Sequence, residues 1–342
     1  MISRILIVGH GSIGRRHLRI ARELFPQNKI AVLRHKISRT VPEYADYTFS
    51  TITEAVEFAP QIAVIANPAT FHLSVAIDLA KIGTHLLIEK PLSTTTKDVA
   101  ELLDVCQKRK VRLATGYNLR FLPSLQKFKS MLDDNKVGTV WSVRSEIGQF
   151  LPSWRPDSDY RQSVSAQSVL GGGALLELSH ELDYLRWIFG ELASVQASLS
   201  KQSDLEVDVE DTAHLILGFA EKADKHQLIA SVNLDFIRQD TTRLCTAIGK
   251  LGSLRWDGIS GTIELYEIGS QAWEVVYQHQ PTRDESYMAE WLDLVNSIEK
   301  KKEPFVSGED GLKVLQIIEA VRLSAKTGSR VDLDDAHLLR GI

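Results

Sequence analysis

Residues 4–14, RILIVGHGSIG, decide the fold of this chain. The apolar run at their start predicts a strand that is buried on both faces, and residues 12–24 have the spacing of a helix. Between the two, Gly9, Gly11 and Gly14 form the pattern G-x-G-x-x-G. In this context the first glycine permits a tight turn, the second lets the backbone approach a pyrophosphate, and the third allows close helix–strand packing.

The same turn predicts a binding site for a dinucleotide. Ser12 and Ile13 complete the loop and open the helix, whose first amide groups attract phosphate. An ordinary glycine turn between a strand and a helix is the alternative, and the glycine pattern alone does not exclude it.

Strand-like and helical runs alternate through the first third of the chain. This alternation predicts βαβ units, and thus an α/β Rossmann domain with a parallel, doubly wound sheet over residues 1–122. The further predicted strands are 29–33, 61–68, 84–91 and 111–117, and the further predicted helices are 70–82 and 95–108.

The pattern changes after residue 122, where strands are followed by helices instead of alternating with them. Residues 123–342 therefore predict an α+β domain with a large open antiparallel sheet. The expected elements are a helix near 124–133, a strand at 139–150, a loop at 151–173, a helix at 174–189, strands at 194–199, 212–220, 227–236, 243–249, 253–256, 262–268 and 272–278, and helices near 286–299 and 309–326.

Charge and composition exclude several classes of protein. The 342 residues carry 40 basic and 44 acidic side chains, a net charge of −4, which argues against a dedicated nucleic-acid-binding protein. No apolar run approaches the ~20 residues of a membrane span, and the first residues lack a signal-peptide cleavage site. The two cysteines, Cys106 and Cys245, do not make a disulfide scaffold, so a reducing cytoplasm is expected.

The residues after the second strand bear on the choice of cofactor. An NAD site usually has an acidic residue there for the ribose 2′-hydroxyl. This chain instead has Arg34 and His35, with Lys36 and Arg39 close behind. A guanidinium can bind a 2′-phosphate that a carboxylate would repel, so NADP is favoured over NAD. A solvated basic loop without a role in selectivity is the alternative.

Glu89-Lys90-Pro91 ends a predicted parallel strand. Ligands of open α/β sheets bind at the carboxyl ends of the strands, and a lysine there can donate a hydrogen bond to a substrate oxygen and stabilise developing charge. The proline restricts the turn that carries Lys90. A strand-end lysine that is merely solvated is the alternative.

A second group of ionisable side chains lies on the helix predicted at 174–189. Glu177, His180 and Asp183 recur every three residues and so share a face. Histidine titrates near neutrality and carboxylates can orient it, which suits acid–base catalysis. A solvent-facing polar stripe is the alternative from spacing alone.

Two further stretches carry side chains suited to a hydroxylated or anionic ligand. Tyr117, Asn118 and Arg120 follow a predicted sheet strand, and Trp154 lies in the loop at 151–173. Ordinary surface placement is the alternative. The ten histidines are dispersed and none has the spacing of a metal-ligand pair, so no metal is expected.

In their order along the chain, these motifs resemble the glucose–fructose oxidoreductase, inositol dehydrogenase and rhizopine-catabolism family, Gfo/Idh/MocA. The resemblance covers nearly the whole chain. It rests on GHGSIGRRH (9–17), Asn67-Pro68 with His72, Glu89-Lys90-Pro91, the stretch 117–121, GGGALLELSHELDYLRWIFG (171–190) and GEDGLKVLQIIEAVRLSAKTG (308–328).

The resemblance implies a Rossmann domain and an α+β domain whose open sheet forms a homodimer or homotetramer. It implies hydride transfer between NADP or NAD and a hydroxyl or carbonyl carbon of a sugar, cyclitol or nucleotide sugar. Two other functions of the same fold remain open: glycoside hydrolysis with transient use of NAD, and non-catalytic sensing of a dinucleotide by a corepressor.

The resemblance also implies roles for single residues. Lys90 would hydrogen-bond the reacting oxygen, and His180 would act as general base in oxidation. Glu177 lies three residues before His180, one residue closer than the Asp of the usual family pattern, and would take the place of that Asp. The cofactor side would include Asn67, Pro68, His72 and Glu89, and the substrate side Tyr117, Asn118, Arg120 and Asp183.

Overall fold

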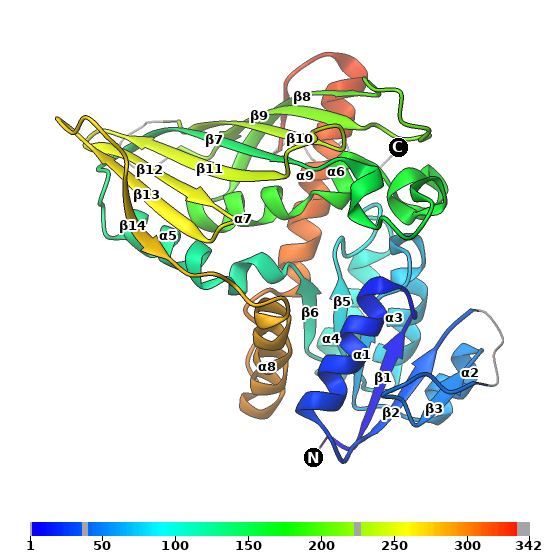
Figure 1. The fold of residues 1–342 in the computed structure, drawn as a ribbon. Coiled ribbons are helices and arrows are strands. Elements are labelled where there is room, and N and C mark those ends of the chain that lie inside the picture. The colour runs from blue at the N-terminus through cyan, green and yellow to red at the C-terminus, as the bar shows by residue number, and fades with distance from the viewer. Residues whose placement is uncertain (1, 36–39, 222–226, 334–342) are drawn as a thin grey trace. The chain divides into compact units, whose positions relative to one another are not determined.

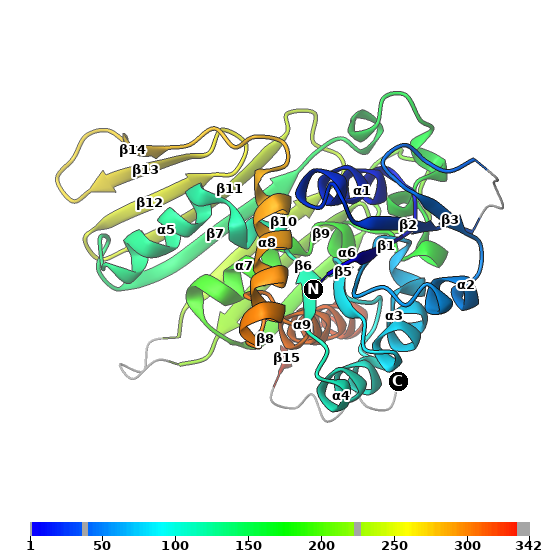
Figure 2. The same cartoon turned by 90° about the horizontal axis from the view of Figure 1, so that it is seen from below.

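The structure is a computed structural model that describes residues 2–35, 40–221 and 227–333. Lys36 and Arg39, which the sequence places in a basic cluster, lie outside the described residues. The chain divides into two compact units, each with its own sheet (Figures 1 and 2).

The first unit combines Met1–Asn118 with a returning segment, Asp284–Leu315, and the remaining residues form the second unit. The sequence places the division at residue 122 and leaves the returning segment in the second domain. The segment joins the first unit because Trp291 and Leu294 are buried in the core of the parallel strands.

The first unit contains the parallel sheet that the sequence predicts. Its strands pair in the order β3-β2-β1-β4-β5-β6, and every pair is parallel. The order reverses beside β1, which is where doubly wound sheets bind ligands. The strands are β1 Arg4–Val8, β2 Lys29–Leu33, β3 Tyr47–Phe49, β4 Ile62–Ile65, β5 His85–Glu89 and β6 Leu113–Gly116.

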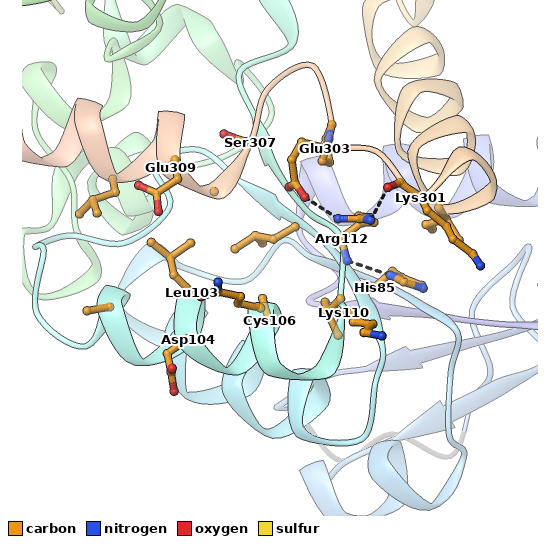
Figure 3. Close-up of a pocket in the computed structure, with 18 residues that line it drawn as sticks. His85, Leu103, Asp104, Cys106, Lys110, Arg112, Lys301, Glu303, Ser307 and Glu309 are labelled. Atoms are coloured by element: carbon orange, nitrogen blue, oxygen red, sulfur yellow. Dashed lines mark hydrogen bonds and ion pairs between the residues drawn. The ribbon is translucent and has the colours of Figure 1, made fainter.

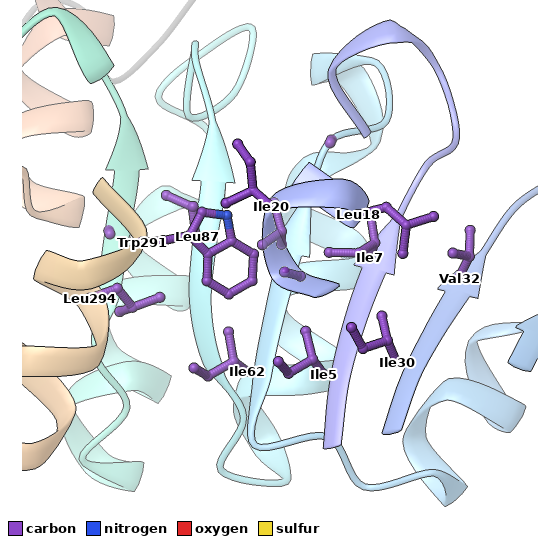
Figure 4. Close-up of a cluster of buried hydrophobic side chains, with 14 residues drawn as sticks. Ile5, Ile7, Leu18, Ile20, Ile30, Val32, Ile62, Leu87, Trp291 and Leu294 are labelled. Atoms are coloured by element: carbon purple, nitrogen blue, oxygen red, sulfur yellow. The ribbon is translucent and has the colours of Figure 1, made fainter. Parts of the chain in front are cut away.

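Helices cover both faces of this sheet. On one face, Leu18 and Ile20 of α1 share a core with Trp291 of α8 (Figure 4), and α3 packs against α4 on the other (Figure 2). Burying one Leu or Ile side chain contributes roughly 1.5–3 kcal/mol, so this shared core fixes α1 to the sheet. The helices are α1 Ser12–Leu24, α2 Ile52–Glu57, α3 His72–Lys81, α4 Val99–Arg109 and α8 Glu285–Lys300.

The second unit contains a large mixed sheet in the order β14-β13-β12-β11-β7-β10-β9-β8-β15. Its described pairs are antiparallel except β7 with β10, which is parallel. The predicted antiparallel sheet is thus confirmed with one exception. The strands are β7 Val140–Gly148, β8 Leu192–Ser200, β9 Thr212–Phe219, β10 Ile229–Asp235, β11 Thr242–Gly249, β12 Gly252–Asp257, β13 Thr262–Glu267, β14 Glu274–Gln278 and β15 Val331–Asp332.

One face of the mixed sheet is covered by helices. α5 (Pro123–Asp133) contacts β12 to β14, and α6 (Ala174–Glu177) contacts β9 and β10. Residues along β10 alternate accordingly: Val232 and Leu234 are buried, whereas Ile229 is exposed. Among the residues that the structure describes, the opposite face therefore exposes side chains, and we call it the open face. The remaining helices are α7 His180–Phe189 and α9 Gly308–Thr327, the latter beginning in the first unit and continuing in the second.

Candidate active site

Two of the three loop glycines are required by packing. Gly9 has φ +92°, and a Cβ on it would lie 2.7 Å from the carbonyl oxygen of Ala66. A Cβ on Gly14 would overlap the carbonyl oxygen of Gly9, whereas on Gly11 it would meet nothing within 4 Å. The first and third glycines therefore shape the turn, and the second leaves open space over the backbone, as a pyrophosphate requires.

The start of α1 fits an anion. Gly11 is the N-cap residue, no side chain caps the helix, and its first turn has no acidic residue. Ser12 is exposed and Ile13 is half-buried. The first amide groups of a helix lack partners within the helix and carry a partial positive charge. The loop therefore fits the phosphates of a dinucleotide.

Other predicted cofactor-side and substrate-side residues follow the carboxyl ends of neighbouring strands. Arg34 follows β2, Asn67 follows β4 after one residue, Lys90 follows β5 and Tyr117 follows β6. Because these strands are parallel, their carboxyl ends meet at one edge of the sheet, the edge that carries the glycine loop. The first unit thus brings these predicted residues to a common edge.

Arg34 is half-buried and held against β3. Its Nε donates to Oγ1 of Thr48 at 3.2 Å, and its Nη2 donates to a nearby carbonyl oxygen. His35 is exposed. Burial, and then the positive charges of Arg15 and Arg34, lower the pKa of His10 in the glycine loop. Positive charge therefore gathers at this corner of the sheet edge, which suits an anionic ligand.

His72 joins two strand ends. Its Nε2 lies 2.8 Å from the carbonyl oxygen of Asn67, and its Nδ1 lies 3.1 Å from that of Pro91. The ring is 1% exposed, and burial lowers its pKa, so a neutral ring donates to one carbonyl at a time. Oδ1 of Asn67 is buried without a hydrogen-bond partner among the described residues, next to the half-buried Pro68. A bound cofactor can satisfy that acceptor.

Glu89 fixes the backbone that carries Lys90. Nε2 of His17 lies 2.7 Å from Oε1 of Glu89, and the backbone N–H of Lys90 donates to Oε2 at 3.2 Å. Burial alone would raise the pKa of Glu89, but the hydrogen bond from His17 and the charge of Lys90 hold it below its ordinary value. The peptide bond from Lys90 to Pro91 is cis.

Tyr117 and Asn118 are buried in the first unit, with exposed fractions of 0% and 6%. Nδ2 of Asn118 donates to Oγ of Ser286 at 2.8 Å, which ties the end of β6 to α8. Both residues therefore have a structural role, and their contact with substrate stays a prediction.

In the second unit, the helix predicted at 174–189 is broken in two. α6 ends at Glu177 and α7 begins at His180, with Leu178 outside the helical region at φ −100° and ψ 22°. The two residues belong to different helices, so the prediction of one shared helical face is wrong for Glu177. Both side chains are half-buried, whereas Asp183 is buried.

The half-buried carboxylate of Glu210 orients the start of α6. Oε1 of Glu210 accepts the amide of Leu175 at 3.0 Å. Gly173 has φ +109°, and a Cβ on it would overlap the carboxylate of Glu210. The glycine turn before α6 is therefore needed to admit Glu210, a residue that the sequence did not single out.

Arg120 and Asp183 form a buried bidentate ion pair. Nε and Nη2 of Arg120 donate to the two carboxylate oxygens at 2.8 and 2.6 Å, and the side chains are 4% and 1% exposed. The guanidinium carbon lies 5.8 Å from the ring centroid of Trp187. The pair fixes α7, which carries His180, and its contact with substrate stays a prediction.

Trp154 is half-buried in the loop at 151–173. Its indole Nε1 donates to the carbonyl oxygen of Gln149 at 3.1 Å, and its ring stands edge-on to Phe236 at 5.2 Å. The loop around it consists largely of short 3₁₀ turns. Its contact with substrate stays a prediction.

A pocket of about 1040 Å³ lies elsewhere in the first unit. Its walls include His85 and Arg112, at the amino ends of β5 and β6, and Lys301 and Glu303 (Figure 3). Arg112 forms an ion pair with Glu303 there. The predicted site residues do not line this pocket, so it is separate from the sheet edge that carries Lys90.

Among the residues that the structure describes, no group of three or more His, Cys, Asp or Glu side chains is placed to hold a metal ion. Within the same ranges, no helix is both long and apolar enough to cross a membrane.

Two family profiles cover most of the chain. The profile described as "Oxidoreductase family, NAD-binding Rossmann fold" matches residues 3–117, and "Oxidoreductase family, C-terminal alpha/beta domain" matches residues 129–333. The chain belongs to the Gfo/Idh/MocA oxidoreductase family. The membership and the two-part fold predicted from the motifs are thereby confirmed.

Two proteins resemble the chain over most of its length, one in sequence and one in structure. It is 26% identical to myo-inositol 2-dehydrogenase of Thermotoga maritima over 280 residues, 80% of this chain and 79% of that protein. The NADH complex of a levoglucosan dehydrogenase has a TM-score of 0.85 at 20% identity and covers 97% of this chain and 99% of its own.

WlbA dehydrogenase from Bordetella pertussis, in complex with NADH and UDP-GlcNAcA, has a TM-score of 0.79 at 22% identity, with 97% of this chain and 99% of its own covered. For three other curated relatives, the chain matches only 35% to 57% of their own length.

Several residues that shape the site were not assigned a role from sequence. Gly116 lies beside Glu89, and Trp291 donates a hydrogen bond to His17. Glu210 accepts a hydrogen bond from the first turn of α6. His17 is the last residue of the motif GHGSIGRRH and lies on the buried side of α1. A histidine at a buried helix position is the signal that could have identified it from the sequence.

Proposed function

We propose that this protein transfers hydride between a nicotinamide cofactor and a hydroxyl or carbonyl carbon of a sugar, cyclitol or nucleotide sugar. The observation that carries the proposal is Lys90, which follows β5 at the sheet edge of the glycine loop, on a backbone held by Glu89. Related proteins named for inositol, levoglucosan and a nucleotide-sugar complex support the substrate class.

The catalytic roles follow from the chemistry of the side chains. In oxidation, Lys90 donates a hydrogen bond to the substrate oxygen and stabilises the charge that develops on it. His180 accepts the hydroxyl proton and returns it in reduction. Glu177, which ends α6 three residues before His180, is the carboxylate proposed to orient it. When bound, the nicotinamide supplies the carbon that accepts or donates the hydride.

The proposed cofactor site begins at the glycine loop. The buried acceptor Oδ1 of Asn67 supports a place for the nicotinamide half of the cofactor. NADP is proposed over NAD because Arg34 stands where an NAD site usually has a carboxylate. The residues of this site are Gly9, Gly11, Ser12, Ile13, Gly14, Arg34, His35, Asn67, Pro68, His72, Glu89 and Lys90.

The proposed substrate-side residues combine aromatic, amide and charged groups, as recognition of hydroxyl-rich ligands requires. They are Tyr117, Asn118, Arg120, Trp154 and Asp183. Arg120 and Asp183 act as a unit in this proposal, because each satisfies the charge of the other.

We also propose a homodimer or homotetramer formed through the open face of the mixed sheet. Ile216 is 50% exposed and Ile229 is 39% exposed on that face, and covering them would remove apolar surface from water. The proposed compartment is the cytoplasm, supported by Cys106 and Cys245, which are both free and buried.

The test is a screen of absorbance at 340 nm with NAD and NADP in both redox states. The substrates are myo-inositol, levoglucosan, common aldoses and UDP-linked acidic sugars. Lys90→Met should lower kcat by about 10²-fold or more while cofactor affinity changes little. Full turnover in that variant, or release of a hydrolysed product without net reduction of the cofactor, contradicts the proposal.

A further inference from the structure

Three buried side chains of the first unit form a continuous hydrogen-bonded chain, here called the Trp291–His17–Glu89 relay. Nε1 of Trp291 donates to Nδ1 of His17 at 3.0 Å, and Nε2 of His17 lies 2.7 Å from Oε1 of Glu89. The other oxygen of Glu89 accepts the backbone N–H of Lys90 at 3.2 Å. Trp291 and His17 are 0% exposed.

The donors and acceptors fix where the proton of His17 lies. An indole N–H can only donate, so Nδ1 of His17 must present its lone pair to Trp291. The ring proton therefore sits on Nε2 and is donated to Glu89. The relay makes Glu89 the acceptor of two hydrogen bonds, one on each oxygen.

The neighbouring strand leaves room for this arrangement. Gly116 of β6 pairs with Glu89 of β5. A Cβ on Gly116 would lie 2.9 Å from Cα of Glu89, 3.0 Å from its Oε2 and 3.1 Å from the backbone nitrogen of Lys90. A side chain at this position would displace both the carboxylate and the strand end that it holds.

Of the buried carboxyl groups of Glu89 and Glu290, the first has a lowered pKa, because of His17 and Lys90, and the second has a raised one. Glu290 of α8 is 2% exposed, and neither of its carboxyl oxygens has a hydrogen-bond partner among the described residues. Burial, then the negative charges of Glu89 and Asp293, raise the pKa of Glu290 well above its ordinary value, so it stays neutral. Tyr287 stands edge-on to His17 at 5.6 Å between centroids.

We propose that Trp291 and His17 are positioning residues for Lys90, acting through the carboxylate of Glu89. The proposal rests on the function proposed for Lys90. The relay joins the helix of the glycine loop, the end of β5 and the returning helix α8 at one point. Its loss would move the lysine by a fraction of an ångström to an ångström, which reduces turnover more than cofactor binding.

The test compares two replacements of His17. His17→Gln keeps an N–H donor for Glu89, whereas His17→Leu removes it at similar volume. We expect His17→Leu to lower kcat by about 10- to 100-fold, and His17→Gln to stay within about 3-fold of the wild type. NADPH affinity, measured by fluorescence, should stay within about 3-fold in both variants.

The turnover probe is the most active of myo-inositol, levoglucosan and UDP-GlcNAcA. Trp256→Phe is the matched control, because its indole also makes a buried hydrogen bond, to Oγ of Ser124 at 3.0 Å, in the second unit. Its kcat should be unchanged. Equal losses of kcat in His17→Gln and His17→Leu, or no loss in either, overturn the proposal.

A spectroscopic measurement does not depend on turnover. In the wild type at pH 7.5, the ¹⁵N shifts of the His17 ring should show one protonated and one unprotonated nitrogen, and Trp291→Phe should change that pattern. A wild-type ring protonated on both nitrogens or on Nδ1 overturns the relay. If Lys90→Met retains turnover, the proposed function fails. If Lys90→Met loses turnover and His17→Leu does not, only the relay fails.

Discussion

The guanidinium of Arg120 gives two parallel hydrogen bonds to the carboxylate of Asp183, and both side chains are buried. The pair connects the turn after β6 to the helix that begins with His180. Because each charge is removed from water, each depends on the other for its stability.

Asp183→Asn should therefore destabilise the protein by about 3–5 kcal/mol, since it leaves the guanidinium buried without its counter-charge. Urea unfolding followed by far-UV circular dichroism measures the loss. The control is Asp133→Asn in the more exposed pair with Lys129, where the cost should be below about 1 kcal/mol. Equal costs in the two variants would contradict the buried pair.

Gly11→Ala separates cofactor binding from folding. A Cβ on Gly11 meets nothing within 4 Å, so the melting temperature should change by less than about 2 °C, while dinucleotide affinity should fall by about tenfold or more. Gly14→Ala is the contrast, because its Cβ overlaps the carbonyl oxygen of Gly9 and should lower stability. The affinity is measured by calorimetric titration with NADPH. An unchanged affinity in Gly11→Ala would contradict binding of the pyrophosphate at this loop.

Arg34→Asp should reverse the preference between cofactors. The new carboxylate repels a 2′-phosphate and can accept the ribose 2′-hydroxyl, so KM should rise for NADPH and fall for NADH by about tenfold each. Steady-state kinetics with both cofactors gives the ratio. Lys29→Asp, at the exposed opposite end of β2, is the control. An unchanged ratio of the two KM values in Arg34→Asp would show that the basic residues after β2 have no role in cofactor selectivity.

Glu290→Gln tests the neutral carboxyl of α8 through the pH dependence of stability. In the unfolded chain this group ionises near its ordinary pKa of 4.5, whereas burial raises the pKa in the folded state. The folded state therefore holds the extra proton, and its stability falls with rising pH by up to about 1.4 kcal/mol per unit. The variant should lack this slope. The difference in unfolding free energy between variant and wild type should therefore shift in favour of the variant from pH 5 to pH 8. Parallel curves would show that Glu290 is ionised when folded.

Ile216→Glu should dissociate an oligomer formed through the open sheet face, because it places a charge amid the apolar contacts. Light scattering coupled to gel filtration measures the molar mass. Ile268→Glu is the control, since Ile268 is 75% exposed just after β13. An unchanged molar mass in Ile216→Glu would show that the interface does not lie on this face. A monomeric wild type would show that no such oligomer forms.

The parts of the fold that sequence predicted are those with strong local patterns. The buried run of β1 and the amphipathic spacing of α1 depend on near neighbours, and both begin and end where expected. β3 is three residues long and partly exposed, so no periodicity marks it. The parallel pairing of β7 with β10 joins residues about 87 positions apart, as in the register of Ser142 with Ile229, and no local pattern encodes it.

The candidate site divides in the same way. Lys90 and Glu89 stand out because a strand-end motif is visible in one stretch of chain. The partners of Glu89 are not visible in that way, since His17 lies 72 residues before it and Trp291 lies far after it. The helix break before His180 was missed because a three-residue spacing looks the same in a continuous helix and across a break.

The returning helix α8 has a consequence for synthesis of the protein. Ile62 and Leu87 share their core with Trp291 and Leu294, which leave the ribosome only after Leu119–Arg283, the larger part of the second unit, has been translated. During that interval the nascent parallel sheet has α1 but not α8 on one of its faces, so part of that face is uncovered. A product that stops after the first 122 residues would expose that surface and would be a substrate for chaperones and proteases, not a working half-enzyme.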